Sequence, residues 1–419
     1  MAKIYALQAK EVFDSRGIPT IELLLWLDNG FSTITSVPTP TDENQNEAVD
    51  LRDNDERLLG LGVHKAINHI NQIIAPQVVE KEITAQGELD KILLDLDGTA
   101  NKSRLGANAI LAVSQAVLKA GAISVGLPLY EYIQKKYNLV QELILPSCIV
   151  TALDGGSHGG KNLDFQEFSL IPASHLSLEK SLEMIAVIKQ KLENLLISKG
   201  AIHATGLTGG FTPNLYRNLD AFELLVEAIR TTPYNFAQDV FFGLQACATR
   251  LFEAGKYRIR DSNQGLTEDE MIKFYEQLRE KYKIIYLEDP FIENDKKSWQ
   301  TLNRDLGETT TIAACRHVAA KVNEINKIQQ NKMANAIVLK PRQIGTVSEL
   351  MESIKAVKDQ NLNLIISHST GETLETFIVD LAVGVGANFV KFGPLNRGER
   401  IVKYNRLLDI SRELNSKEN

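Results

Sequence analysis

The stretch Ile284-Ile285-Tyr286-Leu287-Glu288-Asp289-Pro290 joins four apolar or aromatic residues to two carboxylates and a proline. A short apolar run that stops at polar residues and proline is typical of a buried strand. Three more runs have this character, namely Phe165–Pro172, Ala336–Leu339 and Leu364–Ser367. We therefore predict that all four runs are buried β-strands.

Longer amphipathic stretches alternate with these runs. Their apolar residues recur at helical spacing, and they comprise Leu178–Leu196, Leu219–Thr231, Glu268–Lys281, Val347–Gln360 and Glu372–Val385. Strand–helix units repeated over about 275 residues match the size of an eight-stranded (β/α) barrel. The predicted fold class is thus α/β, with a TIM-like (β/α)8 barrel over residues 141–419.

The first third of the chain has a different organisation. Ile4–Phe13 and Thr20–Leu27 alternate apolar and polar residues as strands do. His64–Ile74 and Asn108–Ala122 place apolar residues at helical spacing. Strands followed by helices predict a separate α+β domain over residues 1–140.

Composition narrows the classes of function. The 419 residues carry a formal net charge of −7, which argues against nucleic acid as a partner. No apolar run approaches the roughly 18–20 residues of a membrane helix, and Met1–Lys10 lacks the core of a signal peptide. Cys148, Cys247 and Cys315 are widely spaced, which indicates free thiols in a reducing compartment. We expect a cytoplasmic protein that does not associate with membranes.

Chemistry in such barrels is located where the strands end, and five polar residues of the predicted strands draw attention: Glu167, Glu288, Lys340, His368 and Lys391. Glu288 is either a metal ligand or a cap of a barrel loop. Lys340 is either a general base with a lowered pKa or a salt-bridge partner of Glu288. His368 either binds an anion or moves a proton, or it is a structural histidine. Lys391 either belongs to the site or is a solvated lysine. Polar residues at several strand ends favour a functional site.

Several motifs resemble the enolase family, the phosphopyruvate hydratases. The similarity extends over nearly the whole chain, and its clearest stretches are Glu11–Thr20, Asn101–Ser103, Gly155–His158, Gln166–Phe168, Glu288–Phe291, Gly371–Thr373 and Lys403–Asn405. The resemblance implies an N-terminal α+β domain, a C-terminal barrel and a homodimer. It also implies a glycolytic activity in which a lysine base and magnesium ions dehydrate 2-phosphoglycerate to phosphoenolpyruvate.

The resemblance assigns roles to individual residues. Lys340 matches the family's base. His158, Glu167, His368 and Lys391 match positions that contact the substrate. Glu288 matches one of three acidic ligands of the principal metal ion.

The chain departs from the family at the residues that carry the chemistry. Gln245 and Cys315 replace the other two acidic metal ligands, and Arg316 replaces a neighbouring aspartate. Thr208 replaces the glutamate that helps hydroxide to leave. Because magnesium prefers carboxylate oxygens and avoids soft sulfur ligands, we expect no firmly bound cofactor and at most weak magnesium binding.

Two further departures fall on the substrate side of the site. Ser369 replaces a substrate-binding arginine, and Asp42 replaces a serine that ligates a second metal ion. A softer metal such as zinc on Glu288, Cys315 and His317 is a less favoured interpretation, because that spacing is unusual.

These departures lead to three hypotheses. The first is an enolase-like pseudoenzyme, impaired or inactive as a hydratase, that keeps the dimer and a pocket for a small anion and in which Arg316 pairs with Glu288. The second is a divergent lyase that uses Lys340 as a base on a carboxylate-bearing substrate, phosphorylated or not. The third is a scaffold or regulatory subunit that forms mixed dimers with a genuine enolase.

Overall fold

A computed structural model describes residues 2–40 and 46–418. The chain begins with a three-stranded antiparallel sheet in the order β1 (Ile4–Phe13), β2 (Pro19–Leu27) and β3 (Ser32–Ser36). Both N-terminal strands predicted from alternation are therefore confirmed. The inward-facing residues Ile4, Leu23 and Leu25 belong to a core that this sheet shares with the following helices.

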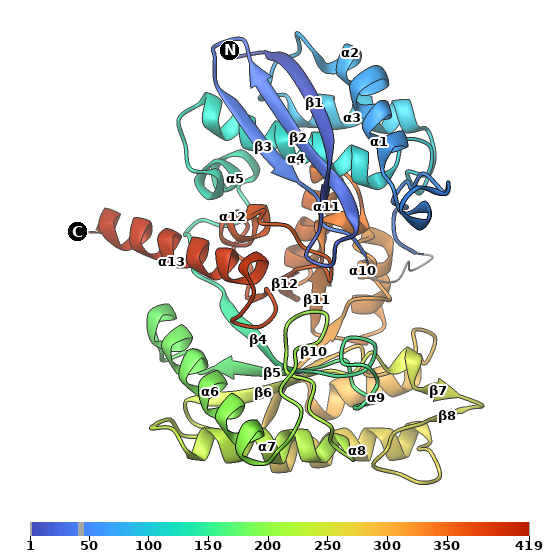
Figure 1. Cartoon of the computed structure of the whole chain (residues 1–419), viewed down its shortest axis with the longest axis vertical. Helices are drawn as coiled ribbons and strands as arrows, with labels where there is room; N and C mark the ends of the chain where they lie inside the picture. The colour runs from blue at the N-terminus through green and yellow to red at the C-terminus, as the bar shows by residue number, and fades with distance from the viewer. Residues whose placement is uncertain (1, 41–45, 419) are drawn as a thin grey trace.

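Helices complete the N-terminal domain above the barrel (Figure 1). They are η1 (Arg57–Gly60), α1 (His64–Asn68), η2 (His69–Ile74), α2 (Ala75–Val78), α3 (Gln86–Asp97), α4 (Ala107–Ser124) and α5 (Leu129–Tyr137). The predicted helix His64–Ile74 is present, but its second half, η2, is a π-helix. The predicted domain boundary at residues 140/141 lies between α5 and the first barrel strand.

Helix α4 contradicts the expectation that no apolar run approaches the length of a membrane helix. Its 18 residues have a mean hydropathy of 1.3, so by length and composition alone it is sufficient to cross a membrane. In the fold 83% of this stretch is buried, because α4 packs against β2 and β3 and also against α3, α5 and α11. A helix that is covered on all sides is apolar all round. The high mean hydropathy of α4 therefore reflects its position in the core of the protein.

Eight strands close the predicted barrel in the order β10-β11-β12-β13-β4-β5-β6-β9. Their bounds are β4 (Ser147–Asp154), β5 (Glu167–Pro172), β6 (Val240–Gln245), β9 (Ile284–Glu288), β10 (Thr311–Ala314), β11 (Ala336–Leu339), β12 (Asn363–Ser367) and β13 (Phe389–Lys391). Apolar side chains, including Ile149, Ile171, Tyr286, Val338 and Ile365, fill the interior.

Strand β5 runs antiparallel to both of its neighbours, so the strand–helix repeat is not regular. The loop 155–166 joins β4 directly to β5, which an antiparallel pair permits without a crossover helix. As a consequence, Glu167 at the start of β5 lies at the same rim as the ends of the parallel strands. Glu167 pairs in register with Gln245, and Gln245 pairs with Glu288.

The barrel helices are α6 (Leu178–Ser198), α7 (Asn218–Arg230), α8 (Glu268–Tyr282), α9 (Lys296–Leu306), α10 (Val322–Gln330), α11 (Val347–Asp359), α12 (Phe377–Gly384) and α13 (Gly398–Glu418). Two short strands, β7 (Phe252–Glu253) and β8 (Lys256–Tyr257), form a hairpin. The helix predicted over Glu372–Val385 is shorter than expected. Its first residues form a loop instead, in which the Glu372 carbonyl accepts from Ser15 N and the Thr373 hydroxyl pairs with Ser36.

The N-terminal domain contacts the loops at the barrel rim. Glu47 binds Arg342 and accepts from Gln343 Nε2 at 3.0 Å, both in η4 (Pro341–Gln343). Thr39 pairs through its backbone with Gly371 after β12. These contacts fix the N-terminal domain over the end of the barrel where the predicted site residues lie.

Candidate active site

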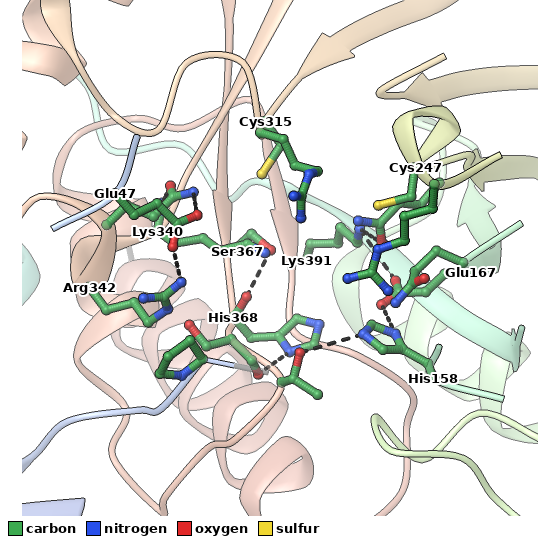
Figure 2. A pocket seen from close by; sticks show the side chains of 18 residues that line it. Glu47, His158, Glu167, Cys247, Cys315, Lys340, Arg342, Ser367, His368 and Lys391 are labelled. Carbon is green, nitrogen blue, oxygen red and sulfur yellow. Dashed lines mark hydrogen bonds and ion pairs between the residues drawn. The ribbon is translucent and has the colours of Figure 1, made fainter. Parts of the chain in front are cut away.

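A cavity opens at the carboxyl end of the barrel, between the strand ends and the N-terminal domain. Figure 2 shows Lys340 and Cys315 on one side of it, Lys391 and Glu167 on the other, and His368 and His158 below. The structure thus brings these predicted site residues together. The described lining is strongly basic: it includes Arg250, Arg316, Lys340, Arg342 and Lys391 against Glu47 and Glu167.

Lys391 lies at the centre of a buried polar network. Its ammonium donates to Gln245 Oε1 at 2.8 Å and to Glu288 Oε2 at 2.6 Å, and it lies 3.3 Å from Glu167 Oε2. Only 2% of the Lys391 side chain is exposed. Burial disfavours the ammonium, but the Glu167 and Glu288 carboxylates outweigh it and raise the pKa of Lys391. The interpretation of Lys391 as a solvated lysine is therefore wrong.

Both oxygens of Glu288 accept hydrogen bonds within the protein. Gln245 Nε2 donates to Oε1 at 3.0 Å, and the Tyr286 hydroxyl joins Lys391 on Oε2 at 2.6 Å. Sequence reasoning missed Tyr286, because its place in an apolar run indicated only a core residue. The cation that pairs with Glu288 is Lys391, which corrects the prediction of a pair with Arg316.

Asp289 is a second buried acid beside Glu288 that sequence reasoning left without a role. Its carboxylate accepts from the backbone N–H of Cys315 at 2.9 Å and of Arg316 at 3.3 Å. Burial and the neighbouring Glu288 raise the pKa of Asp289 to about 7. This acid therefore ties the loop after β9 to the loop after β10.

The donor set can be tested against magnesium. Glu288, Asp289 and Cys315 each bring one candidate ligand atom within 4.8 Å of the others. Burial raises the pKa of Cys315 well above its usual value, so at neutral pH it presents a thiol. Both carboxylates are already engaged in hydrogen bonds, and an ammonium lies against Glu288. A hard ion that requires several oxygen ligands does not fit this set.

Lys340 faces the cavity. Within residues 2–40 and 46–418, no hydrogen bond or ion pair involves its Nζ, so the alternative of a salt bridge to Glu288 is wrong. Burial acts against the Lys340 ammonium, whereas the nearby Glu288 carboxylate favours it, and the net direction is a raised pKa. The expectation of a lowered pKa is therefore not met.

Glu167 and His158 form the opposite wall. His158 Nδ1 lies 3.3 Å from Glu167 Oε1, and the Thr151 hydroxyl donates to Glu167 Oε2 at 3.1 Å. Burial opposes ionisation of Glu167, but Lys391 and His158 outweigh it and hold its pKa well below the usual range. Glu167 is therefore a permanent anion that balances Lys391.

Thr208 does not line the cavity. It is fully buried, and its hydroxyl donates to Asp154 Oδ1 at 2.5 Å. The backbone N–H groups of Thr208, Gly209 and Gly210 donate to Asp154 Oδ2 at 3.1–3.2 Å. The residue that replaces the family's acid therefore fixes a glycine-rich loop. Asp42, the other predicted replacement on the substrate side, lies outside the described residues.

Replacement of Thr208 by valine should lower the free energy of unfolding by about 1.5–3 kcal/mol at pH 8, the usual range for a hydrogen bond to a charged group. Burial raises the pKa of Asp154 to about 6, so this acid is neutral at pH 5 and the loss should shrink there. Urea unfolding at the two pH values measures both effects. Thr212→Val, on an exposed bond of the same loop, should cost little at either pH; a loss equal to that of Thr208→Val would contradict the assignment.

Comparison with known proteins extends the similarity to both domains. A protein-family model described as "Enolase, N-terminal domain" matches residues 4–133, and one described as "Enolase, C-terminal TIM barrel domain" matches residues 142–419. "Enolase 1" of Methylococcus capsulatus (strain ATCC 33009 / NCIMB 11132 / Bath) is 39% identical over 415 residues, which cover 99% of this chain and 98% of that protein. "Enolase" of Ehrlichia canis (strain Jake) is 38% identical over 407 residues, 97% and 95% of the two chains.

Proposed function

Because the chain belongs to the enolase family, we propose that it is an enolase-fold protein that binds a small anion at the barrel mouth without magnesium. We further propose that it lacks appreciable activity in the dehydration of 2-phosphoglycerate. The observation that carries this proposal is the Lys391 ammonium, 2.8 Å from Gln245 Oε1 and 2.6 Å from Glu288 Oε2. A cation of the protein itself lies between the residues that match two of the family's metal ligands.

Competition between this ammonium and magnesium supports the proposal. Magnesium would have to displace Lys391 from Glu288 and also strip the Gln245 and Tyr286 donors from the same carboxylate. The displaced lysine would then lose its partners in a buried position, at a cost of several kcal/mol. Two carboxylates that already accept hydrogen bonds, one amide and a thiol offer a magnesium ion too little in return.

The charge of the cavity supports anion binding. Among the residues that the structure describes, five Lys or Arg side chains line it against two Glu. Glu47 is paired with Arg342, and Glu167 is paired with Lys391. Lys340 faces the same space, and its raised pKa keeps it charged at neutral pH. A small carboxylate or phosphate is the ligand that this balance favours.

Titration with magnesium tests the metal-free part of the proposal. Calorimetry should detect no site of millimolar affinity. About 10 mM magnesium should stabilise the fold by less than roughly 0.4 kcal/mol, the value at which concentration equals Kd, and the melting temperature should barely rise. An enolase with the complete acidic set is the positive control. A saturable heat with a clear rise in melting temperature would refute this part.

The divergent lyase is the second candidate function, and the exposure of the Lys340 ammonium to the cavity favours it. Its raised pKa weighs against it, because an ammonium cannot accept a proton. Pairing as a homodimer or with a genuine enolase, and a cytoplasmic location, stay predictions from the sequence resemblance and the cysteine content.

A further inference from the structure

Arg400 lies directly behind His368, on the side away from the cavity. Its side chain in α13 is fully buried. Its Nη1 lies 2.5 Å from His368 Nδ1 and 3.0 Å from the Ser369 carbonyl, and its Nη2 donates to the Thr370 carbonyl at 2.7 Å. The guanidinium is thus held by three acceptors around one loop.

The contact with Arg400 fixes the position of the proton on His368. Nδ1 of His368 lies 2.5 Å from Arg400 Nη1, a donor, and 2.9 Å from the Ser369 carbonyl, an acceptor. The guanidinium has no acceptor, and the same carbonyl already accepts from Arg400 Nη1. We therefore assign Nδ1 as the acceptor of the shorter contact. A neutral imidazole that accepts through Nδ1 carries its single proton on Nε2. Figure 2 shows the ring turned toward the space between Lys340 and Lys391, and within the described part of the chain no hydrogen bond occupies Nε2.

The surroundings of His368 keep the ring neutral. Burial is the first cause that lowers its pKa, and Arg400 from α13 is the second. Lys391 at the end of β13 and Lys340 after β11 act in the same direction, and Glu167 on β5 acts against them. The result is a pKa well below the usual value for histidine.

Gly393 allows this arrangement. Its backbone has φ +89, a conformation that favours glycine. A Cβ there would lie 3.2 Å from Arg400 Cδ and 3.5 Å from His368 Cε1. The loop after β13 can therefore pack closely over Arg400 and His368 only because position 393 has no side chain.

We propose that the pocket recognises a small oxyanion, a carboxylate or a phosphate-like group, through the Lys340 ammonium and a neutral His368 Nε2–H, and that Arg400 is the positioning residue which fixes that proton. This inference rests on the anion-binding function proposed above and adds the recognition chemistry. Arg400 does not touch the ligand. It acts by keeping His368 a donor that never changes charge.

A consequence is that anion affinity does not depend on the charge of this histidine. An ordinary histidine gains a proton below about pH 6.5 and would then attract an anion more strongly. With its pKa held far lower, His368 donates through the same Nε2–H at pH 5.5 and at pH 7.5. Replacement of Arg400 by methionine removes both the donor to Nδ1 and the charge that disfavours protonation.

The tautomer can be observed without any ligand. Long-range ¹H–¹⁵N spectra of the full chain labelled at histidine report which ring nitrogen carries the proton. The sequence has seven histidines, and the signals that vanish in His368→Gln identify this one. We expect an Nε2–H ring that does not titrate between pH 5.5 and 7.5. In Arg400→Met the ring should titrate. Arg400→Lys retains a donor and should preserve the original spectrum. So should the control Arg412→Met, which replaces an exposed arginine on the same helix.

Anion titration then tests recognition. Sulfate and oxalate keep two negative charges over this pH range and represent the phosphate-like and carboxylate classes. Asp154 and Asp289, whose pKa values are raised to about 6 and about 7, titrate within this range in the wild-type protein and in the variant alike. The wild-type change in affinity between pH 7.5 and 5.5 is therefore the reference. In Arg400→Met the affinity for at least one of these anions should tighten by about tenfold more than this reference, the effect of one unit of pKa coupling.

The outcomes separate the two proposals. An Nδ1–H or titrating ring in the wild-type protein overturns the inference even where anions bind, and so does an Arg400→Lys spectrum like that of Arg400→Met. If Arg400→Met does not fold, the wild-type and Arg400→Lys spectra decide. Failure of both anions to bind a protein with the expected tautomer overturns the anion-binding function and with it the recognition role.

Discussion

Assayed at 240 nm with saturating magnesium, the protein should convert 2-phosphoglycerate at least about 10⁴-fold more slowly than an enolase with the complete acidic set, the loss that a missing general acid alone can reach. The position of that acid is Thr208, whose hydroxyl is bound to Asp154 away from the cavity. Loss of a metal ion that stabilises a developing enolate removes several kcal/mol more. These effects overlap, so we do not add them.

The state of the base lowers the expected rate further. The pKa of Lys340 is raised above its usual value of 10.5. At pH 7.5 the ammonium therefore predominates over the neutral amine, which is the form that can remove a proton. Since the geometry stabilises the ammonium, this residue is better suited to hold an anion than to deprotonate one.

Lys340→Met is the decisive control for this assay. Any slow turnover that the variant retains comes from contaminating enolase. Turnover that requires magnesium and disappears in the variant would establish a working lyase and overturn the proposed inactivity. The same control, run with other carboxylate-bearing substrates, tests the divergent-lyase candidate.

Replacement of Lys391 by methionine should lower the free energy of unfolding by about 3–5 kcal/mol at pH 8, the range for removal of one member of a buried ion pair. The substitution removes the ammonium that Glu167 and Glu288 share, and the side chains of these two residues are 2% and 0% exposed. Lys391 is the main cause that lowers the pKa of Glu167, so without the ammonium this carboxylate would take up a proton more readily. The loss should therefore decrease at pH 5, where protonation relieves the uncompensated charge.

Urea unfolding of matched variants measures this effect. Lys355→Met removes an exposed lysine that pairs with Asp359, and it should cost less than about 0.5 kcal/mol. The double variant Lys391→Met/Glu288→Gln should be less destabilised than the sum of its single changes, because the second substitution removes a charge left unpaired by the first. If Lys391→Met lowers the free energy of unfolding no more than Lys355→Met does, the conclusion that this ammonium holds the buried network together is wrong.

The amino-acid sequence alone was enough to predict the two-domain architecture and to place the site at the rim of the barrel. Hydrophobic periodicity is local, so the buried run Ile284–Leu287 and the alternation in Ile4–Phe13 could be recognised in short windows. Motif similarity supplied the family and the list of residues near the cavity. It also identified Gln245, Cys315 and Thr208 as departures, since substitution at a known position is visible without coordinates.

The pairing of the charges could be read only from the three-dimensional arrangement of the strands. Lys391 binds Glu288 across 103 positions of the chain, and Gln245 binds the same carboxylate across 43. Tyr286 in an apolar run, Asp154 behind Thr208 and the antiparallel β5 carry no local signal of these contacts. Electrostatic energy depends on distance and burial, and barrel closure sets both when it brings separate strand ends within hydrogen-bonding range.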